Sequence, residues 1–307
     1  AYSGILYCYD MATGNVLWTY GNGGLGNTTY SGIEVPGHYP IFVKAISGRT
    51  LNEGVVYTIV TEHTFETPIY KGALTRAINA SDGSEIYTLN AVTGEFGAGS
   101  FTIADSYTNF FNSYDSRIYT LGRGPSETTV TVGPKSSTIG GNVVIEGAVT
   151  DVSVGLQTTE IEGRFPAGVP ACADSSMKDW MAYIHQQQPR PATFTGVNVN
   201  IILIDSNGNY QGPFTTTTDG KGYYSLTYTP NISGDFKVYA YFDGTNGYWQ
   251  SNAEAAFVVN SAAATPAPYP EIALPPTEMY ILSAAAAIIV AIAIGFAVTI
   301  LVLRKRP

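Results

Sequence analysis

The first 260 residues contain many short runs in which apolar and polar residues alternate. Between 197 and 203 the odd positions are Val, Val, Ile and Leu, and Asn occupies positions 198 and 200. Successive side chains of a strand point to opposite faces, so this pattern predicts a half-buried strand. Similar runs predict further strands at 128–132, 143–151, 224–228, 236–242 and 255–259. Turn-forming clusters at 205–209, 219–222 and 230–235 separate several of them. We therefore expect residues 126–260 to form a β-sandwich of about seven strands.

An insert at about 152–192 interrupts these strands and has a helical period. Four of its apolar residues fall on one helical face: Met177, Trp180, Met181 and Ile184. Ser176 and Asp179 fit a capping-box start, and Pro189 ends the pattern. The face is interpreted either as a ligand-contacting Met/Trp stripe or as the packing face of a short helix that covers one end of the sandwich. Apolar residues at this spacing favour packing.

The C-terminal segment lacks charge from Tyr280 to Leu303 and then ends in the basic residues Arg304, Lys305 and Arg306. A helix of about 20 apolar residues crosses a hydrocarbon core of about 30 Å. We predict a transmembrane helix over 279–303 with a cytoplasmic tail of 304–307, because basic residues beside a span remain in the cytoplasm. The Pro-rich segment 261–278 is predicted to be an extended stalk.

Residues 1–125 have a repetitive pattern. Residues 4–18 predict a strand, a tight turn at Thr13 and Gly14, and a second strand that ends at Trp18. Residues 75–87 repeat the pattern with Asp82 and Gly83 in the turn, and 112–121 repeat it in a degenerate form. A Gly-containing turn between two such runs indicates a β-hairpin. A repeat that cannot bury its own faces stacks on its neighbours, so we expect the three hairpins to pack together.

The motif Tyr-Asp-x-x-Thr-Gly-x-x-x-Trp at 9–18 resembles the repeat of pyrroloquinoline-quinone-type β-propellers. The resemblance implies that Asp10, Thr13 and Gly14 shape the turn and that Trp18 packs between blades. It implies an all-β fold with two or three blades of a partial propeller over 1–125. The chain opens on a strand at Ala1 without a Met or a signal-peptide pattern. We expect it to be the C-terminal part of a longer protein that supplies further blades.

The segment Thr-Asp-Gly-Lys-Gly-Tyr-Tyr-Ser at 218–225, with the strands that follow, resembles the Ig-like modules of bacterial and archaeal surface proteins. The resemblance implies that 126–260 is an Ig-like sandwich acting as a spacer or an adhesive unit. The full layout of blades, Ig-like module, stalk, span and basic tail resembles archaeal cell-surface proteins.

The charge of the chain narrows the choice of partners. The chain has 24 acids and 15 bases, and three of the bases follow the span, which leaves a net charge of −12 before it. This acidity argues against nucleic acid and anionic membrane surfaces as partners of the N-terminal part.

The two cysteines, Cys8 and Cys172, are interpreted as small buried residues or as a disulfide pair, because their spacing selects neither.

Few residues suggest catalysis or metal binding. His38, His63 and His185 have no metal-ligand spacing, and Asp205, Asn207 and Asn209 resemble the start of a calcium loop but lack its glutamate. We interpret residues 205–209 as a hairpin turn and expect no catalytic residue, cofactor or metal in this sequence. Candidate N-glycosylation sites lie at Asn27, Asn79 and Asn231, and we expect Asn27 and Asn231 to lie in loops.

The sequence favours a non-enzymatic, membrane-anchored binding or scaffold protein of the cell surface. Its expected partners are membrane lipid around the single span and an extracellular protein or glycan. Two alternatives stay open: a membrane-anchored quinoprotein oxidoreductase whose site lies in further N-terminal blades, and a structural component of the cell envelope.

Overall fold

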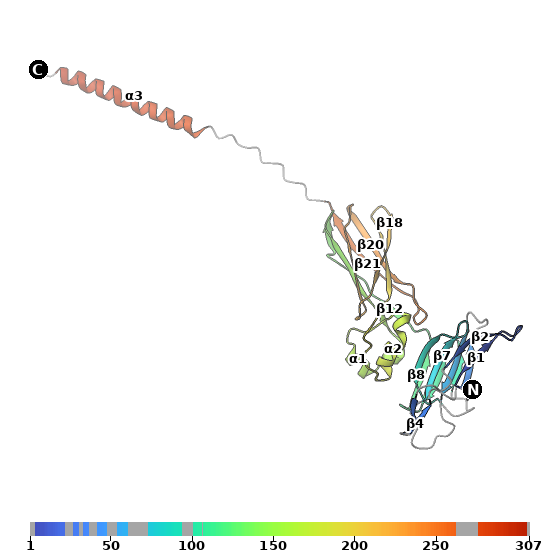
Figure 1. Ribbon diagram of the computed structural model, residues 1–307. Coiled ribbons are helices and arrows are strands. Elements are labelled where there is room, and N and C mark those ends of the chain that lie inside the picture. Colours follow the sequence, from blue (N-terminus) through green and yellow to red (C-terminus); the bar gives the residue numbers. More distant parts are fainter. Residues whose placement is uncertain are drawn as a thin grey trace. The chain divides into compact units, whose positions relative to one another are not determined.

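The computed structural model describes residues 4–21, 27–30, 33–36, 42–47, 54–60, 73–93, 101–105, 107–261 and 276–305 (Figure 1). The chain divides into two compact units, Ala1–Ser261 and Ala262–Pro307. The first unit is mostly β-sheet, and the second contains one apolar helix, α3 (Thr277–Arg304). Of the predicted stalk 261–278, residues 262–275 lie outside the described residues, whereas Thr277 and Glu278 belong to α3, which begins two residues earlier than predicted. The last two residues, Arg306 and Pro307, also lie outside the described residues.

The described residues in the N-terminal part of the first unit form four small sheets. They are the hairpin β1 (Leu6–Tyr9) and β2 (Val16–Tyr20), the hairpin β3 (Asn27–Tyr30) and β4 (Ile33–Pro36), the four-stranded sheet β5 (Phe42–Ser47), β6 (Val55–Val60), β7 (Leu74–Asn79) and β8 (Glu85–Asn90), and the three-stranded sheet β9 (Phe101–Ala104), β10 (Tyr107–Asn112) and β11 (Arg117–Leu121). All pairings in them are antiparallel. The hairpins predicted from the three sequence repeats correspond to β1–β2, β7–β8 and β10–β11.

The β5–β8 sheet packs against a neighbouring sheet on each face. Leu6, Trp18 and Tyr20 of the first hairpin pack on a cluster that includes Val56 and Ile78. Ala77 and Tyr87 form a cross-strand pair on the opposite face, where Tyr87 and Leu89 pack against Phe110 of β10. Stacking therefore buries both faces of a sheet that could not bury them alone. In the part of the chain that the structure describes, the sheets close into neither a barrel nor a propeller.

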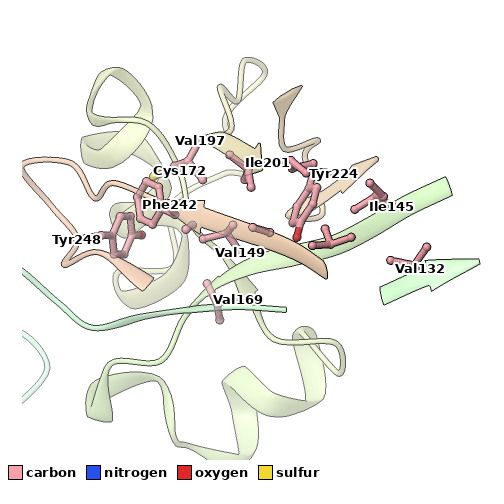
Figure 2. Close-up of a cluster of buried hydrophobic side chains, with 14 of the residues drawn as sticks. Val132, Ile145, Val149, Val169, Cys172, Val197, Ile201, Tyr224, Phe242 and Tyr248 are labelled. Carbon is pink, nitrogen blue, oxygen red and sulfur yellow. The ribbon is translucent and has the colours of Figure 1, made fainter. Parts of the chain in front are cut away.

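Residues 126–260 form two five-stranded sheets around one apolar core. One sheet contains β12 (Ser126–Thr128), β13 (Thr131–Gly133), β15 (Val143–Asp151), β16 (Val169–Pro170) and β19 (Tyr223–Tyr228). The other contains β14 (Ser136–Thr138), β17 (Asn198–Ile204), β18 (Tyr210–Thr217), β20 (Gly234–Phe242) and β21 (Ser251–Asn260). Figure 2 shows part of the shared core, including Ile145 and Val149 of β15 and Ile201 of β17. The narrower Ig-like assignment stays a prediction.

The insert contains η2 (Val154–Leu156), α1 (Thr159–Arg164), β16 and α2 (Asp174–His185). Trp180 of α2 is fully buried in the sandwich core, as expected for a packing face. The capping-box prediction for α2 is wrong. The helix begins at Asp174 after Ala173, and no side chain caps it. Ser176 lies inside the helix, where its Oγ accepts a hydrogen bond from Thr195 N at 2.9 Å.

The two cysteines lie in different environments. Cys172 is buried in the sandwich core, Cys8 is half-buried in β1, and both thiols are free. The alternative of two unpaired residues therefore describes the structure, although only Cys172 is part of a buried cluster.

Candidate functional site

The turn of the first repeat hairpin is held by Asp10. Its Oδ1 accepts hydrogen bonds from Ala12 N at 2.9 Å, Thr13 N at 2.7 Å and Thr13 Oγ1 at 3.0 Å. The bonds from Thr13, and then the bond from Ala12, lower the pKa of the Asp10 carboxyl. Gly14 completes the turn with φ +73° and donates its N–H to Asp10 O at 2.8 Å. A positive φ at this position favours glycine.

The second repeat builds the same turn from different side chains. Asn79 Oδ1 accepts from Ser81 N at 2.9 Å, and Asp82 Oδ1 accepts from Ser84 N at 2.9 Å and from Ser84 Oγ at 2.6 Å. Gly83 has φ +75° and donates to Asn79 O at 2.9 Å. The two turns therefore share one backbone conformation.

Trp18 of the first hairpin packs on the turn of the second. Its indole N–H donates to Ala80 O at 2.8 Å. Its ring lies so close to Gly83 that a Cβ there would be 2.7 Å from Trp18 Cε3. Gly83 therefore supplies both the positive φ and the space for the ring.

Replacing Trp18 with phenylalanine should lower the free energy of unfolding by about 1–3 kcal/mol, since Ala80 O loses its donor in a partly buried place. Chemical denaturation followed by circular dichroism measures the change. Trp249→Phe is the matched control, because Trp249 is half exposed and its ring lies under the Arg123 guanidinium rather than on a glycine turn. An equal loss in the two variants would contradict a specific role for the Trp18 hydrogen bond.

Glu85 connects three parts of the first unit. Its Oε2 accepts from Tyr20 Oη at 2.5 Å, and its Oε1 pairs with Lys178 Nζ of α2 at 2.6 Å. Burial raises the pKa of the Glu85 carboxyl, but the hydrogen bonds from Lys178 and Tyr20 outweigh it and bring the pKa to about 2. The ionised carboxylate is therefore the form that holds this contact.

Acid should weaken this contact. The folded-state pKa of Glu85 lies near 2 against an ordinary value of 4.5, so its contribution to stability is complete above pH 4.5 and is lost as the pH falls toward 2. Glu85→Gln should flatten the dependence of the unfolding midpoint on pH in that window. The exposed Glu254→Gln is the control. A pH profile of Glu85→Gln that matches the wild type would contradict the assignment.

An open groove lies on the sandwich between the edge strand β18 and the sheet of β13, β15 and β19. Its volume is about 610 Å³. Its lining is mainly hydroxyl-bearing and acidic: Thr129, Thr131, Glu146, Gly147, Ala148, Thr216, Thr217, Asp219, Tyr223, Tyr224 and Ser225. The Asp219 carboxylate is occupied by its own turn, accepting from Lys221 N at 2.8 Å and Tyr223 N at 3.0 Å. The Thr131, Thr216 and Thr217 hydroxyls already donate to Glu146 O, Ser225 O and Asn198 Oδ1. The groove can therefore offer the Glu146 carboxylate, hydroxyl oxygens as acceptors and the exposed Tyr223 ring.

The sequence analysis did not identify this groove. Thr131 and Thr217 occupy outward positions of strands, which are polar in any half-solvated sheet. No residue type among them marks a site in the sequence.

The Asp205 segment is a hairpin turn, as predicted. Asp205 Oδ1 accepts from Asn207 N at 2.9 Å and Asn209 N at 3.0 Å, and Oδ2 accepts from Asn209 Nδ2 at 3.1 Å. The turn therefore uses oxygens that a calcium ion would need. Within the described residues, no three His, Cys, Asp or Glu side chains form a group that could hold a metal. His38 and His63 lie outside those residues.

The candidate glycosylation sites differ in exposure. Asn231 is exposed in the connection between β19 and β20. The Asn79 side-chain oxygen accepts hydrogen bonds from Ser81 N and Ser81 Oγ in the second repeat turn. The expectation of a loop at Asn27 is wrong, since Asn27 is the first residue of β3 and pairs with Pro36. Of the two sequons whose side chains the structure describes, Asn231 is therefore more accessible than Asn79.

Helix α3 is the one candidate membrane span in the part of the chain that the structure describes. It has 28 residues, none of them buried, and Arg304 is its last residue, followed by Lys305. At 1.5 Å per residue it is about 42 Å long, more than the roughly 30 Å of a hydrocarbon core. Such a helix is consistent with a single-pass membrane anchor.

The chain matches no family model and no curated protein. One solved structure that it resembles is a tetra-tandem repeat in the extending region of a large adhesion protein, at 16% sequence identity and a TM-score of 0.29. The match covers 72% of this chain and 48% of that chain, so the chain spans about half the length of the structure that it matches.

Proposed function

We propose that this protein is a non-enzymatic binding or scaffold protein of the cell surface, anchored by α3 with its N-terminal unit outside the cell. The observation that carries the proposal is the 28-residue apolar helix, fully exposed and ending in Arg304, after a β-rich unit. A helix that is apolar on all sides is suited to lipid. Basic residues at its C-terminal end favour a cytoplasmic C-terminus.

The proposal divides the chain by role. Residues 1–125 present stacked repeat sheets, described as blades of a partial propeller, and 126–260 form an Ig-like spacer with the groove described above. The Pro-rich stalk, predicted at 261–278 and ended by the start of α3 at Thr277, lifts both from the membrane. Arg304 at the end of α3 and residues 305–307, including Arg306, supply the basic tail predicted at 304–307. The hydroxyl-lined groove is the surface that we assign to an extracellular protein or glycan.

Protease treatment of intact cells tests the topology. Cleavage near 261–278 should release the β-rich unit while α3 remains in the membrane fraction. Immunoblots with tags at each end of the chain follow the two products. Protection of the unit until the membrane is permeabilised would invert the topology and refute the surface role.

Charges at the centre of α3 should release the protein from the membrane. An arginine at a helix centre costs about 2.5–3.5 kcal/mol of insertion free energy per residue, so Val290→Arg with Ile294→Arg should move the protein to the soluble fraction. Met279→Arg near the end of α3 is the control and should stay membrane-bound, since its side chain can reach the interface. Carbonate extraction measures both. Continued membrane retention of the double variant would contradict a transmembrane α3.

A further inference from the structure

The turn of the first repeat is uncovered, although the corresponding turn of the second repeat is covered. Among the described residues other than Gly14 and its two chain neighbours, no atom lies within 4 Å of a Cβ built on Gly14, whereas a Cβ on Gly83 would meet the Trp18 ring. Met11, one residue after Asp10, is 99% exposed. Ala80, one residue after Asn79, is 5% exposed. The two turns therefore differ in what covers them.

The backbone of the first turn already has the conformation that receives an indole in the second. The φ of Gly14 is +73° and that of Gly83 is +75°. Asp10 N donates to Asn15 O at 2.8 Å, and Asn79 N donates to Ser84 O at the same distance. The carbonyl of Met11 corresponds to that of Ala80, which accepts the Trp18 N–H. Little ordering of the backbone would thus be needed to receive a ring.

The outward face of the first hairpin is apolar as well. Tyr9 corresponds to Ile78, one residue before each turn, and is 54% exposed, whereas Ile78 is fully buried beneath the first hairpin. The exposed aromatic and aliphatic side chains on the hairpin are Tyr7, Tyr9, Val16 and Leu17. The rings of Tyr7 and Tyr9 stack with centroids 6.0 Å apart. An aromatic surface beside a preformed turn is typical of a protein-binding site.

We infer that residues 4–21 form a docking site for a further β-hairpin of the same repeat, contributed by a segment that these 307 residues do not contain. A tryptophan of that hairpin would lie on Gly14 and donate its indole N–H to the Met11 carbonyl. Its apolar neighbours would cover Tyr7 and Tyr9. The site therefore recognises a Trp-bearing repeat hairpin, and this assignment does not depend on the membrane anchoring proposed above.

A second copy of this chain has no suitable tryptophan to offer. The chain has three. Trp18 lies on Gly83, Trp180 is fully buried, and Trp249 is held beside Arg123 in the sandwich, with 4.4 Å from Cζ to the ring centroid. None lies on a free hairpin, so the occupant is a different repeat.

Binding of a repeat peptide to the full chain tests the inference. The probe is a fluorescent, backbone-cyclised peptide of residues 4–21, whose own Trp18 supplies the indole and whose hairpin fold is checked by NMR before use. Anisotropy titration against the full chain in detergent should give saturable binding. Replacing the peptide's Trp18 with alanine should weaken the affinity about tenfold or more, since a ring contact and a hydrogen bond are lost.

Gly14→Asn in the full chain is the matching variant. Asparagine tolerates a positive φ, so the turn is kept while its side chain fills the space of the ring. This variant should abolish saturable binding. Gly208→Asn is the control, because Gly208 has φ +81°, nothing within 4 Å, and lies in the distant turn between β17 and β18.

Three results would overturn the inference. They are no saturable binding of the folded peptide, equal binding of the peptide with alanine at position 18, and unchanged binding by Gly14→Asn. Self-association of the full chain that Gly14→Asn abolishes, seen by sedimentation velocity, would instead place a second copy on the hairpin. None of these results bears on the protease test of membrane topology.

Discussion

Replacing Trp180 with alanine should lower the free energy of unfolding by about 3–5 kcal/mol, the usual cost of deleting a buried tryptophan. The side chain is fully buried in the sandwich core. Its ring makes edge contacts with Phe194 at 4.8 Å and Phe165 at 5.8 Å between centroids. Its N–H donates to Pro170 O at 3.1 Å. The substitution therefore removes ring packing, opens a cavity and leaves a buried carbonyl without its donor.

Denaturant unfolding of the wild type and two variants measures this effect. Trp180→Phe keeps part of the ring packing and should cost less than the alanine variant. Trp249→Ala is the surface control, since Trp249 is half exposed. An unchanged midpoint for Trp180→Ala, together with loss of partner binding, would reassign the Met/Trp face of α2 from packing to recognition.

Strands with one buried face were the most predictable part of this fold. The alternation at 143–151 matches β15 (Val143–Asp151), and those at 224–228 and 236–242 lie within β19 and β20. A period of two survives in these segments because one face of each sheet packs on the core. β18 (Tyr210–Thr217) was not predicted, since its sequence contains Gly212 and Pro213. Among the described strands it pairs with β17 alone and lies at the sheet edge, and an edge tolerates proline.

Helix starts were less predictable, because several side chains compete for each cap. Ser176 fits a capping position in the sequence but instead accepts a hydrogen bond from Thr195 N. The unpredicted α1 does have a side-chain cap, since Thr158 Oγ1 accepts from Ile161 N at 3.3 Å. Glu160 and Glu162 lie in its first turn, where acidic residues favour a helix start, and they were the sequence signal that could have predicted α1. The local sequence at Ser176 does not reveal that its hydroxyl is used elsewhere, because its partner, Thr195 N, lies in a distant segment of the chain.

The candidate surfaces could be predicted only in part. Asp10, Thr13 and Gly14 were identified from the sequence, and so were Asp82 and Gly83. The difference between the two turns arises from the position of the Trp18 ring, which only the tertiary packing sets. The groove depends on β18, a strand that local patterns missed, so no sequence signal located it.

Adding a single methyl group at Gly147 is expected to lower the free energy of unfolding more than so small a change usually does. Gly147 lies in β15 opposite Tyr224. The chain at Thr129 crosses directly above it, and a Cβ on Gly147 would lie 1.9 Å from Thr129 O and 2.7 Å from Tyr224 Oη. Hydrogen bonds fix Thr129 at this place. Tyr224 Oη donates to Thr129 O at 2.6 Å, Thr129 N donates to Ala148 O at 2.9 Å, and Ala148 N donates to Thr129 Oγ1 at 3.0 Å.

Gly147→Ala should therefore lower the free energy of unfolding by roughly 3 kcal/mol or more, since overpacking and the loss of hydrogen bonds each cost about 1–3 kcal/mol. The backbone at Thr129 cannot yield as a flexible side chain would, because its bonds join β12 and β13 to β15. Gly163→Ala is the matched control: Gly163 lies in α1 with nothing within 4 Å of its Cβ position. Alanine there should be neutral or stabilising by up to about 1 kcal/mol, since it favours a helix. Equal stability of the two alanine variants in chemical denaturation would show that Thr129 does not lie over Gly147 in solution.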